Sequence, residues 1–220
     1  MSRSPLLLGH RGARSIPGVA ENTFAAFDLA ISSGCDGFEF DVRLSADGIA
    51  VVAHDHTTNG HDITNIPAAQ LPALPRLEAV LEKYAEHAVL DIELKVPGSG
   101  GAAIAAIHKC LPQHCIVSSF LPAVLYEVRE LHDSIALGFI CDDPEKLPQW
   151  RGLPCDYVIV HHALVSQGVI DEVHASSRKM IVWTVNHATR MRELALAGAD
   201  GIISDDPGLL NRALQFGRQP

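Results

Sequence analysis

Short apolar segments typical of β-strands alternate with amphipathic segments typical of helices through the whole chain. The strand-like segments are a hairpin of two strands at residues 36–55 and single strands at 6–8, 89–96, 115–120, 135–140, 157–160, 180–185 and 201–203. The helix-like segments lie at residues 23–33, 77–87, 102–111, 122–132, 167–178, 188–197 and 207–216. Strands that alternate with helices in this way indicate parallel βα units.

Eight of these strands would close a (β/α)8 TIM barrel, an α/β fold, and one arm of the hairpin would remain as an addition at the C-terminal mouth. A doubly wound open sheet is the alternative. The Gly-x-Gly-x-x-Gly fingerprint that often accompanies such sheets is absent from the sequence, which favours the barrel.

Length, charge and cysteine usage limit the class of protein. The 220 residues suit one large domain spanning residues 1–220. A formal charge of −9 disfavours nucleic acid or an anionic membrane as a main partner, and no apolar run approaches the ~20 residues of a membrane span. The five cysteines form no Cys-x-x-Cys pair, so we expect reduced thiols in a cytoplasmic protein rather than disulfides or a zinc site. The sequence does not define the oligomeric state.

The hairpin carries two acidic residues on one strand face. Phenylalanines alternate with Glu39 and Asp41, as in a strand whose two faces differ. A turn centred on residues 46–47 would put His54 opposite Glu39, and one centred on residues 47–48 would put it opposite Asp41. A three-residue loop with a bulge would break both registers. Since like charges on one face repel, the pair of carboxylates predicts a metal ion.

Polar side chains recur at the carboxyl ends of the predicted strands, which a barrel brings together at one mouth. They are His10, Arg11, Glu39, Asp41, His54, Asp55, Glu93, Lys95, Ser118, Ser119, Trp183, Asn186, Ser204, Asp205 and Asp206. The carboxylates of Glu39, Asp41 and Glu93 suit a hard divalent cation, Ca²⁺ or Mg²⁺.

Two cations and two histidines complete this set. Arg11 and Lys95 suit a phosphate group, and His10 and His54 suit a general acid and a general base near neutral pH. A metal site, two cations and two imidazoles around one anion indicate phosphodiester cleavage.

Short motifs built around these residues follow one another along nearly the whole chain. They are His10-Arg-Gly12, Glu21-Asn-Thr23, Glu39-Phe-Asp41-Val42, Asp47-Gly48, Val52-Ala-His54-Asp55, Glu93-Leu-Lys95, Ser118-Ser-Phe120, Trp183-Thr-Val-Asn186 and residues 198–207. In this order they resemble the motifs of the glycerophosphodiester phosphodiesterase family. The resemblance implies a TIM barrel, metal ligands at Glu39, Asp41 and Glu93, catalytic histidines at His10 and His54, phosphate contacts from Arg11 and Lys95, and Trp183 against the substrate.

Two features depart from the family pattern. Ala20 stands where the family usually has proline, and residues 57–75 are markedly shorter than the insertion that usually follows the second histidine. The shortened insertion leaves the catalytic set intact, but the head group of the substrate is not defined by the sequence.

The site residues also have structural alternatives. The strand carboxylates could form salt bridges with Arg43, Glu93 and Lys95 could form a same-face ion pair, and Trp183 could belong to the core. The two histidines could be structural. Asn22 is expected to cap the helix that follows it.

The leading hypothesis is a metal-dependent enzyme that cleaves glycerophosphodiesters to an alcohol and sn-glycerol 3-phosphate. A lysophospholipase D-like activity is a second enzyme hypothesis, and it would require an apolar surface around the mouth. A non-catalytic barrel that binds phosphorylated ligands is a third, but a binding protein has no use for an acid–base pair of histidines.

Overall fold

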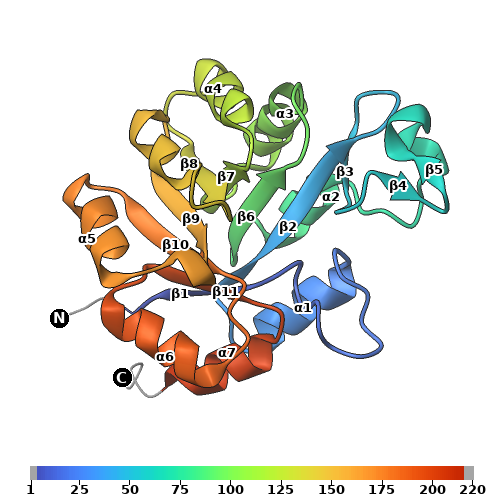
Figure 1. Cartoon of the computed structure of the whole chain (residues 1–220). Helices are drawn as coiled ribbons and strands as arrows, with labels where there is room; N and C mark the ends of the chain where they lie inside the picture. The colour runs from blue at the N-terminus through green and yellow to red at the C-terminus, as the bar shows by residue number, and fades with distance from the viewer. Residues whose placement is uncertain (1–3, 216–220) are drawn as a thin grey trace.

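Eight parallel strands close a barrel in which the first strand pairs with both the second and the last (Figure 1). The computed structural model describes residues 4–215. In barrel order the strands are β1 (Leu6–Gly9), β2 (Gly37–Leu44), β6 (Val89–Leu94), β7 (His114–Ser119), β8 (Ala136–Cys141), β9 (Tyr157–His161), β10 (Lys179–Trp183) and β11 (Gly201–Ser204). Closure joins Leu8 to Gly37 on one side of β1 and Leu6 to Gly201 on the other. The predicted (β/α)8 TIM barrel is confirmed.

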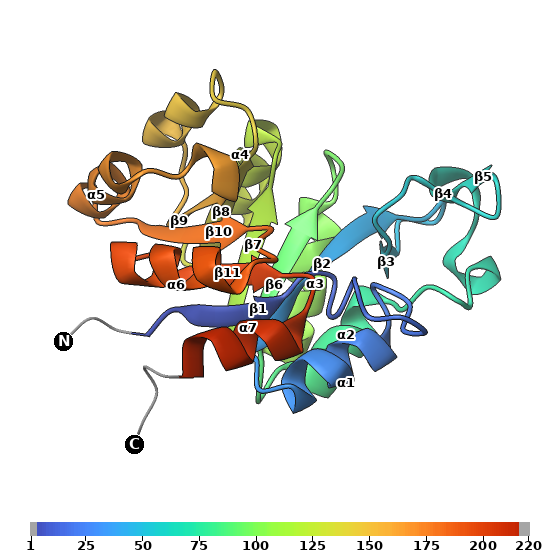
Figure 2. The ribbon, with the colours of Figure 1, turned by 60° about the horizontal axis from the view of Figure 1, so that its bottom comes forward.

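An outer layer of helices surrounds the strands (Figure 2). The α-helices of the described residues are α1 (Phe24–Ser32), α2 (Leu77–Tyr84), α3 (Gly100–Cys110), α4 (Pro122–Leu131), α5 (Gln167–Ala175), α6 (Ala188–Ala197) and α7 (Pro207–Leu214). The connection from β8 to β9 contains instead the 3₁₀ helix η3 (Leu147–Gly152). Between residues 4 and 215, no helix has the length and apolar character that a membrane crossing requires.

Local sequence signals set several helix ends. The Thr23 hydroxyl accepts a hydrogen bond from the backbone N–H of Ala26 and so caps α1. Gly198 ends α6 with a φ of 102°, which glycine adopts without steric cost. Pro207 occupies the first turn of α7, where its missing N–H is not needed.

The alternation along β2 separates an apolar face from an acidic face. Phe38 and Phe40 pack outward into the core between the barrel and its helices, and the Phe38 ring stacks on Phe27 of α1 with centroids 4.3 Å apart. Burial of each ring stabilises the fold by about 1.5–3 kcal/mol. Because side chains alternate along a strand, Glu39 and Asp41 point to the opposite face, into the barrel.

A second apolar cluster fills the interior of the barrel. It consists of Leu8, Ile116, Ile140, Ile159, Ile181 and Ile203, one residue from each of six strands. The acidic side chains of β2 lie near this cluster, at the end of the barrel where the strands terminate.

The hairpin forms, but both expected registers are wrong. Strand β3 (Ala50–Val52) runs antiparallel to β2, and Ser45 bonds Ile49 through backbone and hydroxyl groups, which encloses three residues in the loop. In this register His54 would face Phe40 if the pairing continued. The ladder ends before that point, and the Arg43 guanidinium donates to the backbone carbonyl of His54 at 2.8 Å. His54 therefore reaches the mouth from the loop after β3.

The short segment after the hairpin forms a small unit beside β3 (Figure 1). It contains β4 (Thr57–Thr58), β5 (His61–Asp62) and two 3₁₀ turns, η1 (Ile63–Asn65) and η2 (Ala68–Gln70). Its apolar residues pack with the returning arm in a separate cluster of Val51, Ala53, Ile63, Ala68 and Leu71.

Candidate active site

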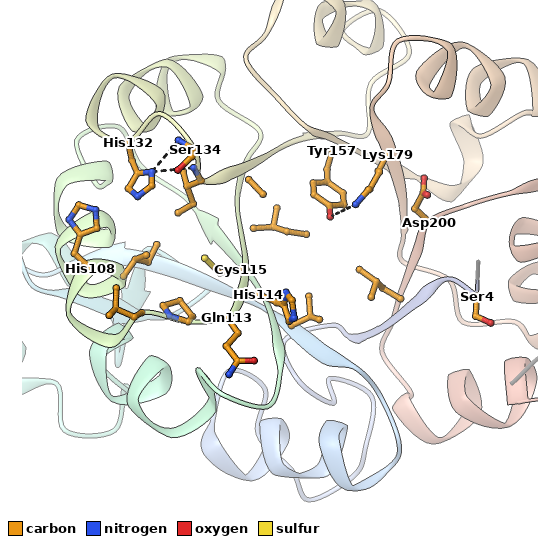
Figure 3. A pocket seen from close by; sticks show the side chains of 18 residues that line it. Ser4, His108, Gln113, His114, Cys115, His132, Ser134, Tyr157, Lys179 and Asp200 are labelled. Carbon is orange, nitrogen blue, oxygen red and sulfur yellow. Dashed lines mark hydrogen bonds between the residues drawn. The ribbon is translucent and has the colours of Figure 1, made fainter. Parts of the chain in front are cut away.

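The barrel is hollow at both ends, and the larger hollow lies at the amino ends of the strands. It has a volume of about 710 Å³ and is shown in Figure 3. Several of its polar groups already have partners: Lys179 donates to the hydroxyl of Tyr157 at 3.3 Å, and His132 Nδ1 accepts from the backbone N–H groups of Ser134 and Ile135. The carboxylates of Glu39, Asp41 and Glu93 lie at the other end of the barrel.

The smaller hollow, the mouth pocket, lies at the carboxyl ends of the strands and has a volume of about 240 Å³. It is lined by His10, Arg11, Glu39, His54, Asp91, Glu93, Lys95, Phe120, Ile140, Asp142, Ile159, Trp183 and Ile203. Seven of the eight residues proposed from the sequence line this pocket. The eighth, Asp41, lies directly beside it with its carboxylate close to those of Glu39 and Glu93.

Three buried carboxylates meet at one side of the mouth pocket. Strands β2 and β6 are neighbours, and their register puts Asp41 opposite Glu93. One oxygen from each of Glu39, Asp41 and Glu93 lies within 4.8 Å of the others. All three side chains are buried, so they repel one another in a medium that screens charge poorly.

The surroundings shift the pKa of each carboxyl group. Burial, followed by the charges of Asp41 and Glu93, raises the pKa of Glu39 well above its ordinary value. Burial raises the pKa of Glu93 to about 7 despite the nearby Lys95. Burial acts in the same direction on Asp41, but Lys95 and Arg11 together hold its pKa below the ordinary value.

This donor set fits a hard divalent cation. The buried oxygen Glu39 Oε1 accepts no hydrogen bond from any residue between 4 and 215. A carboxylate oxygen left without a donor in the interior is costly, and a cation bound by Glu39, Asp41 and Glu93 would satisfy it. Oxygen ligands alone favour Ca²⁺ or Mg²⁺ over softer metals.

Two basic side chains, those of Lys95 and Arg11, neutralise part of the negative charge of the carboxylates. Lys95 Nζ lies 2.7 Å from Glu93 Oε1 and 3.2 Å from Asp41 Oδ1. The Arg11 guanidinium lies 3.3 Å from Asp41 Oδ2 and donates to Glu21 at 2.7 Å. The same-face ion pair of Glu93 with Lys95, expected as an alternative, is therefore present, and the phosphate contacts of Arg11 and Lys95 remain a prediction.

A tight turn after β1 positions Arg11 against the carboxylates. Arg11 has a φ of 48° and Gly12 a φ of 81°, both in the left-handed region that glycine tolerates best. A Cβ atom on Gly9 would lie 1.9 Å from the carbonyl oxygen of Gly12, so the turn requires glycine there. The turn directs the backbone N–H of Arg11 at Glu39 Oε2, 2.9 Å away.

The two histidines reach the mouth pocket from different elements, His10 from the turn after β1 and His54 from the loop after β3. His10 Nδ1 is 2.6 Å from Asp205 Oδ1, and its Nε2 lies 3.8 Å from Glu39 Oε2. His54 is about one-third exposed, and its Nδ1 is 2.8 Å from Asp55. In each case a carboxylate holds one ring nitrogen and leaves the other free for chemistry.

Trp183 borders the mouth pocket and is only partly buried. Its ring makes edge contacts with Phe120 and His161, each with centroids 5.5 Å apart. It also packs against the apolar cluster in the barrel, so it combines a core contact with a position at the pocket.

Comparisons with known proteins identify the family. A family model described as the Glycerophosphoryl diester phosphodiesterase family matches residues 10–98 and 99–209. A glycerophosphodiester phosphodiesterase of Caldanaerobacter subterraneus is 30% identical over 96% of this chain and 98% of its own. The chain belongs to this family. As a family member it is a phosphoric diester hydrolase.

Solved structures of the family share the fold. A phosphodiesterase of Oleispira antarctica, in complex with the product sn-glycerol-3-phosphate, has a TM-score of 0.83 and 27% identity, over 96% of this chain and 97% of its own. A glycerophosphodiester phosphodiesterase of Thermotoga maritima has a TM-score of 0.84 and 25% identity, over 96% and 99%.

The structure of this phosphodiesterase corrects the expected role of Asn22. Thr23, and not Asn22, caps α1. Asn22 has a φ of 56° and donates from its amide to Asp41 Oδ2 at 2.8 Å, while its oxygen accepts from the backbone N–H of Asp41. The sequence does not reveal this contact, because an asparagine just before a helix is equally typical of a residue that caps the helix.

Two further residues complete the surroundings of the site. Asn186 donates to Asp205 Oδ2 at 2.7 Å and accepts from the backbone N–H of Asp205, so it fixes the carboxylate that holds His10. Asp91 lies deeper in the pocket, and the sequence had shown it only as a member of the polar alternation along β6.

Proposed function

We propose that the chain acts as a single domain, residues 1–220, and hydrolyses glycerophosphodiesters to an alcohol and sn-glycerol 3-phosphate with the help of a divalent cation, Ca²⁺ or Mg²⁺. The observation that supports this most directly is the convergence of three carboxylates, two cations and two imidazoles on one small pocket. The product bound to the Oleispira antarctica relative supports the substrate class.

Glu39, Asp41 and Glu93 would hold the cation. Bound there, it would lower the pKa of the substrate's glycerol 2-hydroxyl and stabilise negative charge on the phosphoryl oxygens. Arg11 and Lys95, which border the same carboxylates, would add positive charge around the phosphate.

The two histidines would move the protons. His10 Nε2 faces Glu39 and is assigned as the base that accepts the proton of the 2-hydroxyl. The 2-hydroxyl oxygen then attacks phosphorus, the bond to the leaving alcohol breaks, and His54 protonates the departing oxygen. The cyclic 1,2-phosphate formed in this step is opened by water with the two histidines in reversed roles.

The residues around His10 prepare it for this role. The carboxylate of Asp205 would accept a hydrogen bond from the Nδ1–H group of His10, so that the lone pair is on Nε2, the nitrogen nearer Glu39. Although burial acts to raise it, the hydrogen bond from His10 keeps the pKa of Asp205 below its ordinary value, so the carboxylate stays charged. Trp183 would contact the substrate at the outer part of the pocket.

A substrate screen tests the proposed function. The purified chain is incubated with glycerophosphocholine, glycerophosphoethanolamine, glycerophosphoinositol, glycerophosphoglycerol and lysolipids, and sn-glycerol 3-phosphate is measured before and after chelation. We expect release from one or more of the glycerophosphodiesters, loss of release with EDTA, and recovery with Ca²⁺ or Mg²⁺. Undiminished release after rigorous chelation would exclude the cation, and cleavage of lysolipids alone would favour the lysophospholipase D-like activity.

A cytoplasmic location and a part in lipid metabolism belong to the same proposal. The sequence contains no Cys-x-x-Cys pair, which fits a reducing compartment.

A further inference from the structure

A fourth carboxyl group, that of Asp91, lines the mouth pocket beside the carboxylates that would hold the cation, and the strand register puts it opposite Glu39. Asp91 precedes Glu93 by two residues on β6, so both point into the barrel, with Asp91 one step further from the open end. The pocket is also lined by Ile140, Ile159 and Ile203, which belong to the apolar cluster inside the barrel. Asp91 and these three isoleucines are called the floor of the pocket below.

One oxygen of this group has no partner. Asp91 is fully buried, and its Oδ1 accepts a hydrogen bond from the hydroxyl of Ser118 at 2.6 Å. Its Oδ2 is also buried and accepts no hydrogen bond from any of residues 4–215. A buried carboxyl oxygen without a donor is costly, so a group that supplies a donor from the pocket would be bound favourably.

The residues that line the pocket favour one kind of hydrogen-bond donor to Asp91. The carboxylates of Glu39, Asp41 and Glu93 occupy neighbouring positions on β2 and β6, so an anionic group would be repelled beside Asp91. The isoleucines of the floor offer no polar group that could solvate a cationic ligand. A neutral hydroxyl on a short carbon chain fits both features, because its carbon atoms contact the isoleucines and its O–H donates to Oδ2.

We propose that Asp91 forms a hydroxyl subsite that binds the terminal hydroxyl of the substrate's glycerol group. The inference rests on the proposed function and identifies which end of the diester enters the floor. With the 2-hydroxyl beside His10 and Glu39, the next carbon of glycerol carries the terminal hydroxyl toward Asp91. The leaving alcohol then lies at the outer part of the pocket, beside Trp183. Asp91 is a specificity residue that distinguishes glycerol from a diol lacking that hydroxyl.

The test compares two diesters with the same leaving alcohol. One contains glycerol, and the other contains propane-1,2-diol, which keeps the 2-hydroxyl and replaces the terminal hydroxyl with hydrogen. We expect wild-type kcat/KM to favour the glycerol diester by roughly 10- to 100-fold, the range expected for one hydrogen bond to a charged or buried group. Equal kcat/KM for the two diesters would overturn the proposal. If neither diester is cleaved, the proposed function itself has failed.

Variants separate a subsite from a structural role. Asp91→Leu replaces the carboxyl group with an apolar side chain, and we expect it to reduce the preference for glycerol to near one, because kcat/KM for the glycerol diester falls more than kcat/KM for the propanediol diester. A merely structural Asp91 would change both substrates by the same factor. The control Asp142→Asn removes a carboxylate from the rim of the same pocket and should leave the ratio unchanged.

A binding measurement on the wild-type protein tests the subsite even if Asp91→Leu does not fold. The wild-type protein is titrated with sn-glycerol 3-phosphate and with the matching propanediol phosphate in a calorimeter. Tighter binding of the glycerol compound supports the subsite, and equal binding of the two contradicts it. If Asp91→Leu does not give a folded circular dichroism spectrum, Asp91→Ala takes its place in the kinetic comparison.

Discussion

His10 and Asp205 are separated by 195 residues in the sequence, yet His10 Nδ1 and Asp205 Oδ1 lie 2.6 Å apart. The two residues follow the first and last strands of the barrel, which are hydrogen-bonded neighbours. Asn186 contributes to the same arrangement from the loop after β10. The proposed base is therefore oriented by the carboxyl-terminal part of the fold.

Asp205→Asn should lower kcat by at least roughly tenfold, because the amide can present its N–H to His10 Nδ1 and so favour a proton on Nε2. The pH profile of kcat should change shape as well, which a loss of stability alone would not cause. The matched control is Asp206→Asn in the next position, where asparagine still caps α7. An unchanged pH profile in Asp205→Asn would remove the positioning role.

His10→Ala and His54→Ala should each lower kcat by roughly 10²-fold or more, since each removes one partner of the proton transfer. The wild-type pH profile should be bell-shaped, because one imidazole must be neutral and the other protonated. His174→Ala is the control: His174 also pairs with an aspartate, Asp200 at 2.8 Å, but lies outside the mouth pocket. Near wild-type kcat in either site variant would exclude that histidine.

Metal-free protein should be more stable at pH 5.5 than at pH 8. The folded-state pKa values of Glu93 and Asp91 are raised to about 7, and that of Glu39 is also raised, chiefly by burial. The folded protein therefore binds more protons than the unfolded chain between pH ~4 and ~7, and stability falls as pH rises through this range. Scanning calorimetry in the presence of a chelator measures the effect.

The raised pKa values of these carboxyl groups also predict how an added divalent cation affects the stability of the protein. A divalent cation should raise Tm strongly at pH 8 and little at pH 5.5, because the carboxyl groups must lose their protons to bind it. Glu93→Gln should flatten both dependences, while Glu130→Gln, at an exposed position on α4, should leave them unchanged. A Tm that rises with pH in the metal-free protein would contradict the assignment of these buried groups.

A glycerophosphodiester whose 2-hydroxyl is replaced by hydrogen should be cleaved roughly 10³-fold more slowly than the parent, or slower still, because attack from within the substrate has a large proximity advantage. A methyl ether at the same position gives a second analogue. Cleavage at an ordinary rate with similar KM would show that water attacks phosphorus directly.

Much of the barrel and site could be predicted because the relevant pattern is local. The alternation of Phe38 and Phe40 with Glu39 and Asp41 indicates which side chains face the helices and which face the barrel, and the structure has this arrangement. The hairpin register depended instead on the three-residue loop between Ser45 and Ile49. Loop geometry of this kind is not determined by the period of the side chains.

Contacts between distant segments were the part that the sequence could not define. The amide of Asn22 bonds Asp41 only because the loop after β1 folds against β2, and the sequence showed no more than a residue suited to a helix cap. The unpartnered oxygen of Asp91 is likewise a result of packing, since it depends on which donors the neighbouring strands supply.

The pairing of β1 with β11 has a consequence for biosynthesis. A ribosome produces His10 near the start of translation and Asp205 close to the end, so most of the growing chain exists without the carboxylate that orients its histidine. Chains interrupted before residue 201 lack the strand that closes the barrel. They could bury much of the apolar core yet lack the carboxylate that orients the proposed base, so catalytic competence should appear only when the final βα unit has emerged and docked.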